Sequence, residues 1–303
     1  MSVSLPLGSD SIRCSDFSRL NELDPGGTAM VAELVVVVEI GEPWPKPVGK
    51  HPGLVELVAK ATAHPEQVRL LAAVPHDPTR PRIIGFRRIA GGMTRSEVVL
   101  GSHPVSDLLT VLHADIGRDV VGPDATRTVL VCTQGSYDVC CGADGGAFAD
   151  DLVAAQPELE VFRVSHTGGH RFAPTAMTLP DGRMWAYLTR PVMDQLLDRT
   201  LPADRAAELC RGWWGAPTGP AQIAERAVFA QVGWELDQLD RRTSVEQAAD
   251  GRHRVSVDVD IDTWSVLIEH GREVPTIACE APGGLPAKPG RELTVASGPV
   301  RVG

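Results

Sequence analysis

Short apolar runs alternate with amphipathic segments along the first part of the chain. Apolar runs of about four to eight residues are typical of buried strands, and apolar positions spaced three and four apart are typical of helices. The predicted elements, in chain order, are a strand at 32–40, a helix from 54, a strand at 68–74, a hairpin of 82–88 and 96–100 across Gly91-Gly92, and a helix capped by Ser106. This stretch therefore predicts the order β-α-β-β-β-α.

The same order of elements recurs in the next stretch. The predicted elements are a strand at 127–131, a helix over 148–155, a strand at 160–165, a hairpin of 176–179 and 183–188 around Pro180-Asp181-Gly182, and a helix from Pro191 through Arg199. Two consecutive units of one order indicate a duplicated α/β module. The order fits a thioredoxin-like sandwich.

From about residue 201 the pattern changes. The predicted elements are a short helix at 204–211, a break at Trp213-Trp214, a long helix at 218–239, and strands of alternating polarity at 254–261, 264–269 and 276–280. These strands are acidic, which favours packing over the alternative of a winged DNA-binding module. The predicted fold class is α/β, with two tandem thioredoxin-like α/β modules plus a small C-terminal α+β appendage. The corresponding domains are 1–120, 121–200 and 201–303.

Composition narrows the class of protein. The chain has 303 residues, of which 43% are apolar and 22% charged, as is usual for soluble globular proteins. A net charge of −10 argues against a nucleic-acid partner. The longest apolar run, 34–38, is far too short to span a bilayer, and the first residues lack the basic and apolar regions of a secretory signal. We therefore expect a cytoplasmic protein whose six cysteines are thiols or metal ligands.

Two segments carry the candidate chemistry. They are CTQGSYDVCCG at 132–142 and SHTGGHRFAPT at 165–175, and they contain the patterns Cys-x8-Cys and His-x3-His. Each segment begins at the end of a predicted strand, and these two strands are joined by a predicted helix. Parallel strands with a crossover helix end at the same edge of a sheet, so the two segments are expected to meet there.

The residue types suit a metal ion or cluster, and the alternative is a pair of buried thiols with two hydrogen-bonded histidines. Two thiols and two imidazoles suit either zinc or an iron–sulfur cluster. Structural zinc sites usually pair their cysteines more closely than eight residues apart, so the spacing favours a cluster with two metal ions. Mixed cysteine and histidine ligation of a [2Fe–2S] centre is known from Rieske sites.

These two segments, together with LPDG at 179–182, resemble the sucrase/ferredoxin-like family. That family includes thioredoxin-like ferredoxins with a bis-histidine, non-Rieske [2Fe–2S] cluster. The resemblance implies that Cys132 and Cys141 bind one iron, and that His166 and His170 bind the other. The family spacing favours Cys141 over Cys140.

The sequence departs from the family pattern at two places. Tyr137 stands where many relatives carry a basic residue, and the loop 143–146 is glycine-rich and acidic. Neither departure removes a ligand. The family name implies no sugar chemistry for this chain, since we find no convincing pair of carboxylates for glycoside hydrolysis.

The resulting hypothesis is a one-electron carrier or redox sensor, more an electron-transfer protein than an enzyme with its own substrate. Its partner would be a redox protein that donates or accepts the electron. Two alternatives use the same residues: a zinc-stabilised structural or interaction module, and a thiol enzyme working through Cys140-Cys141. The lack of a Cys-x-x-Cys motif speaks against the thiol enzyme.

The remaining cysteines and histidines have simpler interpretations. We interpret Cys14, Cys210 and Cys279 as structural, since they lie on unrelated elements, and Cys140 as a packed thiol or an alternative ligand. The histidines of the first module have no cysteine partners at its strand ends. That module therefore resembles a copy without a site.

Overall fold

A computed structural model describes residues 12–114, 120–122, 127–279 and 288–302. The α-helices are α1 (Cys14–Leu20), α2 (Val55–Thr62), α3 (Pro104–Leu112), α4 (Gly146–Ala155), α5 (Arg190–Leu197), α6 (Ala203–Leu209) and α7 (Gly219–Val232). The shorter helical turns are η1 (Val48–Lys50), η2 (Cys141–Gly145), η3 (His170–Phe172) and η4 (Trp234–Gln238). The strands are β1 (Leu34–Glu39), β2 (Val68–Ala73), β3 (Arg82–Ile89), β4 (Gly92–Val99), β5 (Val120–Val121), β6 (Thr128–Cys132), β7 (Glu160–Val164), β8 (Ala176–Leu179), β9 (Arg183–Trp185), β10 (Cys210–Trp213), β11 (Arg241–Gln247), β12 (His253–Val259), β13 (Asp262–Thr276) and β14 (Lys288–Arg301).

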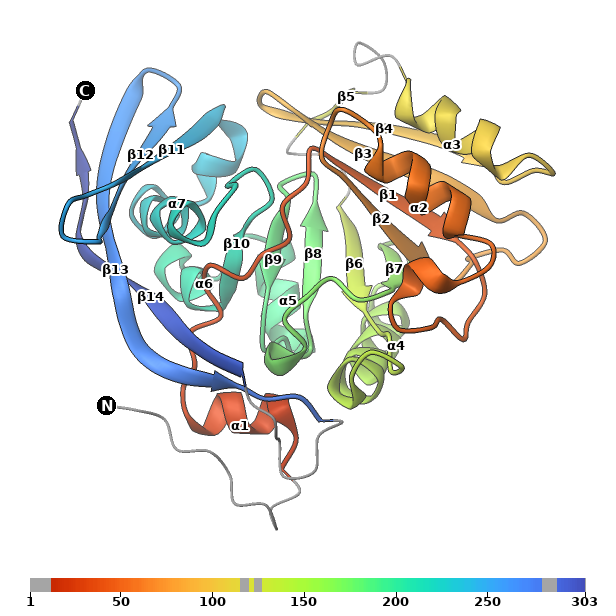
Figure 1. Ribbon diagram of the computed structural model, residues 1–303, viewed down its shortest axis with the longest axis horizontal. Helices are drawn as coiled ribbons and strands as arrows, with labels where there is room; N and C mark the ends of the chain where they lie inside the picture. The colour runs from red at the N-terminus through yellow and green to blue at the C-terminus, as the bar shows by residue number, and fades with distance from the viewer. Residues whose placement is uncertain (1–11, 115–119, 123–126, 280–287, 303) are drawn as a thin grey trace.

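The central sheet contains ten strands in the order β10-β9-β8-β6-β7-β2-β1-β3-β4-β5 (Figure 1). Within it, β1 and β2 pair in parallel and β3 and β4 continue antiparallel, and the second half repeats this arrangement with β6, β7, β8 and β9. The repeated element order is therefore confirmed. The two halves meet edge to edge, where β2 and β7 share one antiparallel bridge between Ala73 and Val164.

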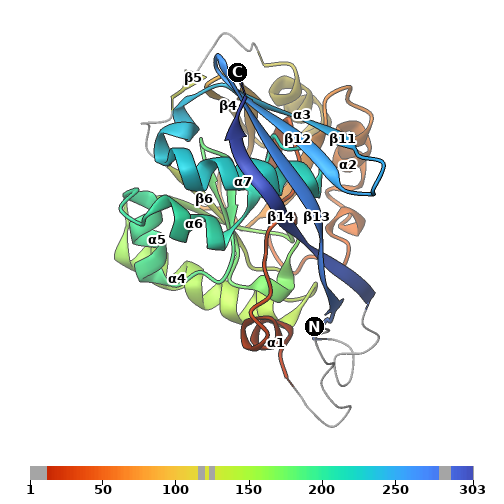
Figure 2. The same ribbon diagram turned by 90° about the vertical axis from the view of Figure 1, so that its left-hand side faces the viewer.

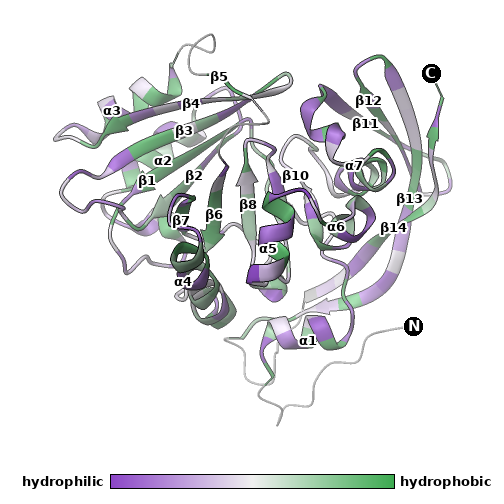
Figure 3. Ribbon diagram, turned by 180° about the vertical axis from the view of Figure 1, so that it is seen from behind, coloured by the Kyte–Doolittle hydropathy of each residue, from purple (hydrophilic) through white to green (hydrophobic). Residues whose placement is uncertain are grey.

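Alternating side chains of the strands build separate cores on the two faces of the sheet. On β1, Leu34, Val36 and Val38 pack with α2 and α3. The alternate residues Val35 and Val37 share a second core with residues from β6, β7 and β8 of the other half. The strands that build these cores are strongly hydrophobic (Figure 3). The two repeated units therefore lie in one continuous sheet and share a core.

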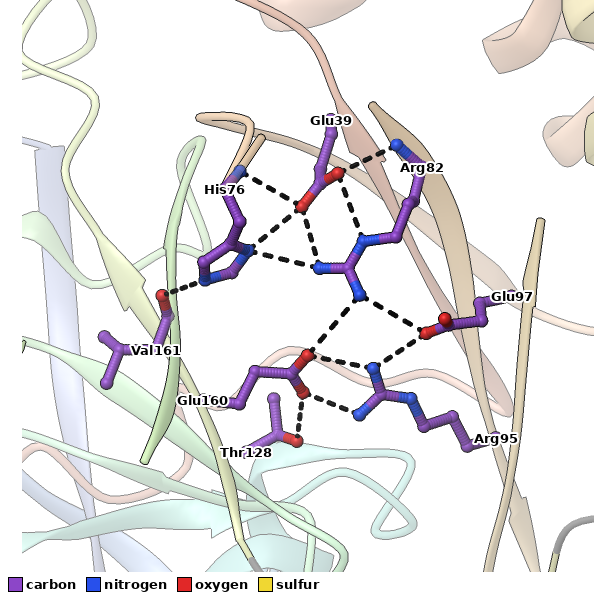
Figure 4. A network of polar contacts seen from close by, with 8 residues as sticks. All are labelled: Glu39, His76, Arg82, Arg95, Glu97, Thr128, Glu160 and Val161. Atoms are coloured by element: carbon purple, nitrogen blue, oxygen red, sulfur yellow. Dashed lines mark hydrogen bonds and ion pairs between the residues drawn. The ribbon is translucent and has the colours of Figure 1, made fainter. Parts of the chain in front are cut away.

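A charged network fastens the seam between the halves (Figure 4). Arg95 on β4 contacts Glu160 on β7, with 2.6 Å between a guanidinium nitrogen and a carboxylate oxygen. Arg82 on β3 bonds the buried Glu39, with 3.0 Å between their atoms. His76 links that carboxylate to the carbonyl of Val161, at 3.0 Å on each side. Side chains therefore supply contacts where the backbone supplies only one bridge.

The C-terminal part forms a four-stranded antiparallel sheet, β11-β12-β13-β14, which packs on α7 (Figure 2). As predicted, Val255, Val257 and Val259 face a core, which they share with α7 and the second half of the central sheet. The long strands β13 and β14 extend from this sheet toward α1 (Figure 1). The C-terminal part therefore shares a core with the second half of the central sheet.

Several predicted boundaries in the C-terminal part are wrong for local reasons. Cys210–Trp213 is not the end of a helix but an edge strand that pairs with β9. The helix α7 ends at Val232 because Gly233 adopts a φ of 96°, which favours glycine. Strand β11 was not predicted. The strand expected at 276–280 does not form over its described residues 276–279, since Thr276 only ends β13.

Two further details differ from the sequence prediction. The helix expected to be capped by Ser106 begins earlier, at Pro104, with His103 at the N-cap. Ile261, expected on the inner face of a strand, lies in the turn between β12 and β13 and is 92% exposed.

Among the residues described, none of the helices combines the length and apolar character that crossing a bilayer requires.

Candidate metal centre

The ends of β6 and β7 place the first site. Cys132 is the last residue of β6, and it lies beside Val164, the last residue of β7, in a parallel pair. His166 follows two residues later, and its backbone N–H donates to the side-chain oxygen of Gln134 at 2.9 Å. The predicted convergence of the two motifs at one edge of the sheet is therefore confirmed.

A short π-helical turn brings the second thiol to this edge. The turn η2 begins at Cys141 and continues into α4. A Cβ atom at Gly145 would overlap the carbonyl oxygen of Cys132, so the turn packs directly on the end of β6. Single π-helical turns of this kind are frequent at functional sites.

Cys132, Cys141 and His166 form a compact group, which we call the strand-edge site. Their three ligand atoms lie within 4.8 Å of one another. Each sulfur is 3.8 Å from Nδ1 of His166. Both thiols are buried, and the imidazole is half-buried. This set has the composition and spacing of a metal-ligand group.

The electrostatics of the strand-edge site favour one thiolate and a neutral imidazole. The Cys141 thiol donates to the Cys132 sulfur and holds the pKa of Cys132 well below its usual value, and His166 acts in the same direction. The same bond, together with burial, raises the pKa of Cys141. Burial lowers the pKa of His166, which favours the neutral imidazole. The pair of thiols therefore shares one proton, which a metal would displace.

His170, the fourth predicted ligand, is turned toward other groups. Its Nδ1 lies 3.1 Å from a carboxylate oxygen of Asp138 and 3.3 Å from the sulfur of Cys14. Its ring centroid is 5.9 Å from that of His166. The structure therefore brings three of the four predicted ligands together. With Nδ1 engaged by a carboxylate, Nε2 is the nitrogen of His170 left for a metal.

Arg211 lies next to the histidine loop and was not singled out in the sequence. It is fully buried, its Nε donates to the hydroxyl of Thr28 at 3.1 Å, and Nη1 has no partner among the described residues. A Cβ at Gly169 would lie 2.6 Å from its guanidinium carbon, so this glycine is what admits the arginine. Burial lowers the pKa of Arg211 to about 10, and the nearby Cys132 sulfur acts in the opposite direction.

Tyr137 covers the accessible side of the strand-edge site. Its ring stacks on His166 with 3.4 Å between centroids and 12° between planes. Lys46 lies over the same ring at 4.5 Å. A cavity of about 430 Å³, lined in part by Arg69, Gln134 and His166, lies beside this stack. Access to the site is therefore through its histidine side.

The structure corrects the interpretation of two other cysteines. Cys14 and Cys279, expected to be unrelated structural residues, both lie against Cys140. Cys210 is buried apart from these thiols, on β10. Sequence reasoning missed this second group because its members are far apart in the chain, and no spacing motif connects them.

A comparison with family models finds a match to sucrase/ferredoxin-like proteins over residues 25–212, which is more than half of the chain. The match contains all four predicted ligands and Arg211, whereas Cys14 and Cys279 lie outside it. Neither the curated proteins nor the solved structures provide a match to this chain.

Proposed function

The chain belongs to the sucrase/ferredoxin-like family, and from this membership and the strand-edge site we propose that it is a [2Fe–2S] electron carrier or redox sensor. The proposed ligands are Cys132 and Cys141 on one iron, with His166 and His170 on the other. The observation that carries the proposal is the meeting of two buried thiols and one imidazole, all within 4.8 Å, at the edge of the sheet.

The residues around the strand-edge site support this assignment. The hydroxyls of Thr133 and Thr167, next in sequence to two of the ligands, are buried without a partner among the described residues. The Nη1 atom of Arg211 is also buried without a hydrogen-bond partner among these residues. Hydrogen-bond donors near the sulfurs are the usual means by which a protein tunes an iron–sulfur centre. Orphaned donors at this place therefore fit a cluster with inorganic sulfides.

When bound, a [2Fe–2S] cluster supplies one-electron chemistry, and its reduction adds one negative charge. The chain's own residues prepare for that charge. Cys132 and Cys141 bind as thiolates, His166 and His170 bind as neutral imidazoles, and the buried Arg211 cation favours the more negative state. The stack of Tyr137 on His166 is the side that a redox protein would approach, as the electron donor or acceptor.

The scaffold would consist of two thioredoxin-like modules. Each half of the central sheet has the same strand order, β2-β1-β3-β4 in the first and β7-β6-β8-β9 in the second. Each half also has a helix between its two parallel strands and another after its fourth strand. The ligands come from the second half.

The test is anaerobic purification of the full chain, followed by a visible spectrum, electron paramagnetic resonance and assays of iron and sulfide. We expect a coloured protein with two irons and two sulfides per chain. Cys132→Ser and His166→Ala should lose iron and sulfide together. The control Cys210→Ser changes a buried thiol outside the strand-edge site and away from Cys140, so this variant should keep both iron and sulfide.

Zinc at the strand-edge site is the competing assignment, because three ligand atoms within 4.8 Å are also compact enough for one ion. A colourless wild-type protein that contains zinc and loses it in the Cys132→Ser variant would favour zinc. Iron and sulfide in equal amounts would favour the cluster.

A further inference from the structure

Three cysteines from distant parts of the chain meet beside the strand-edge site. Cys14 begins α1, Cys140 precedes η2, and Cys279 follows the end of β13. The Cys140 sulfur lies 3.3 Å from that of Cys279 and 3.6 Å from that of Cys14. Cys14 and Cys140 are fully buried, and Cys279 is half-buried. We call these residues the three-thiol cluster.

Asp138 adds a carboxylate to the three-thiol cluster. It is 1% exposed, and its Oδ1 lies 3.5 Å from the Cys14 sulfur. The ligand atoms of Asp138 and the three cysteines all lie within 4.8 Å of one another. A buried carboxylate among thiols is a poor hydrophobic contact, whereas buried charged groups commonly pair with cations or coordinate metals.

Hydrogen bonds hold these donors in place. The backbone N–H groups of Cys140 and Cys279 donate to Asp138 at 2.9 Å and 3.1 Å. The Ser15 hydroxyl donates to the Cys140 sulfur at 3.2 Å, and the backbone N–H of Cys14 donates to the Cys279 sulfur at 3.2 Å. Such outer bonds orient and stabilise the anionic ligands of metal sites.

The distances between the sulfurs indicate the kind of metal. With Zn–S bonds of about 2.3 Å, a tetrahedral site separates its sulfurs by about 3.8 Å. The two S···S distances in the three-thiol cluster, 3.3 Å and 3.6 Å, are close to this separation. They are far longer than a disulfide bond, and they leave no room for several irons and sulfides between the cysteines.

We propose that Cys14, Cys140, Cys279 and Asp138 form a second metal site that binds one zinc ion. This site uses other residues than the strand-edge site, and its proposal does not rest on the function proposed there. Zinc would connect α1 and the end of β13 to the loop that supplies Cys141. Asp138 would link the two sites, because its other oxygen contacts His170 at 3.1 Å.

The test measures zinc and iron separately in the full chain. Protein from zinc-supplemented cultures is dialysed and analysed for both elements, and the visible spectrum is recorded. We expect one zinc per chain in the wild type. Cys279→Ser should lose zinc and keep the iron content, Cys132→Ser should lose iron and keep zinc, and the control Cys210→Ser should keep both.

X-ray absorption at the zinc edge of the wild type keeps the proposal testable even if Cys279→Ser fails to fold. Three sulfurs and one oxygen around zinc would support it, whereas two sulfurs with nitrogen would place zinc at the strand-edge site and overturn it. A Cys279→Ser variant that keeps zinc would overturn it as well. So would zinc-free wild type with a disulfide among Cys14, Cys140 and Cys279, shown by mass spectrometry without reduction.

Discussion

The fully buried cation Arg211 lies close to the strand-edge site. Its guanidinium is bonded to Thr28, and its Nη1 has no hydrogen-bond partner within the described parts of the chain. In a poorly solvated interior, such a charge acts on its neighbours more strongly than it would in water. The Cys132 sulfur, which acts to raise the pKa of Arg211, is one of those neighbours.

Replacing Arg211 with Gln should therefore lower the reduction potential of the bound cluster. The lost positive charge disfavours the reduced, more negative state, and we expect a decrease on the order of tens of millivolts. Arg211→Lys retains the charge and should recover most of the potential. A redox titration followed by visible absorption measures both variants. Equal potentials in Arg211→Gln and wild type would show that the arginine has only a structural role.

The candidate residues could be predicted from the sequence only where a motif connects them. Cys132, Cys141 and His166 follow from strand ends and spacing, because parallel strands bring their ends together. Cys14 and Cys279 are 265 residues apart, and only the completed fold makes them neighbours. The rotation of His170 toward Asp138 is equally invisible in the sequence, since it depends on a hydrogen bond between two loops.

At the scale of elements, the helix α7 is held to the sheet by buried charge as well as by apolar contacts. Arg183 on β9 is fully buried and bonds Glu225 of α7 at 3.0 Å and Asp237 of η4 at 2.8 Å. Arg241 on β11 contacts the same two carboxylates. This network joins the central sheet to the C-terminal sheet.

Replacing Arg183 with Met should strongly destabilise the protein. The change leaves Glu225 and Asp237 buried with one cation between them, and breaking a buried ion pair in this way typically costs about 3–5 kcal/mol. Urea denaturation measures the free energy of unfolding. Arg205→Ala is the matched control, since Arg205 forms an exposed pair with Glu208 and its loss should cost less than about 1 kcal/mol. Similar losses in both variants would contradict the argument.

The elements of the central sheet were predicted more accurately than those near α7, and the difference is physical. Strand β1 is a continuous apolar run, and the α2 face repeats with helical period, so local pattern defines both. Strand β10 lies at the end of a helical pattern and becomes a strand only because β9 offers a free edge. Tertiary pairing, which the local pattern does not contain, decided that element.

At the scale of the whole molecule, the two halves of the central sheet are joined with little backbone pairing. Because β2 and β7 share a single bridge, the shared core and the charged network of Figure 4 supply most of the contacts between the halves. Repetition in the sequence predicted two similar units, but not that they would join edge to edge. That junction depends on pairs such as Arg95 and Glu160, which are distant in the chain.

The seam network should make the stability of the protein depend on acid pH. Burial alone would raise the pKa of Glu39. Hydrogen bonds from Arg82 and His76 outweigh burial and hold this pKa below its usual value of 4.5. Burial would also raise the pKa of Glu160, but the contacts with Arg95 and Thr128 outweigh it, so this pKa is lowered as well. A carboxylate with a lowered pKa stabilises the folded state above its ordinary pKa. That contribution is lost as the pH falls through the lowered value.

We therefore expect the free energy of unfolding, measured with urea, to fall between pH 6 and pH 3, with these two carboxylates contributing on the order of 1 kcal/mol. The variant Glu39→Gln, Glu160→Gln should be less stable than wild type at pH 6 and should lose less of its remaining stability on acidification. Glu208→Gln, at an exposed helical pair, is the control and should follow the wild-type curve. Parallel curves for the wild type and the double variant would show that other groups govern acid unfolding, and that the seam is held by its apolar core alone.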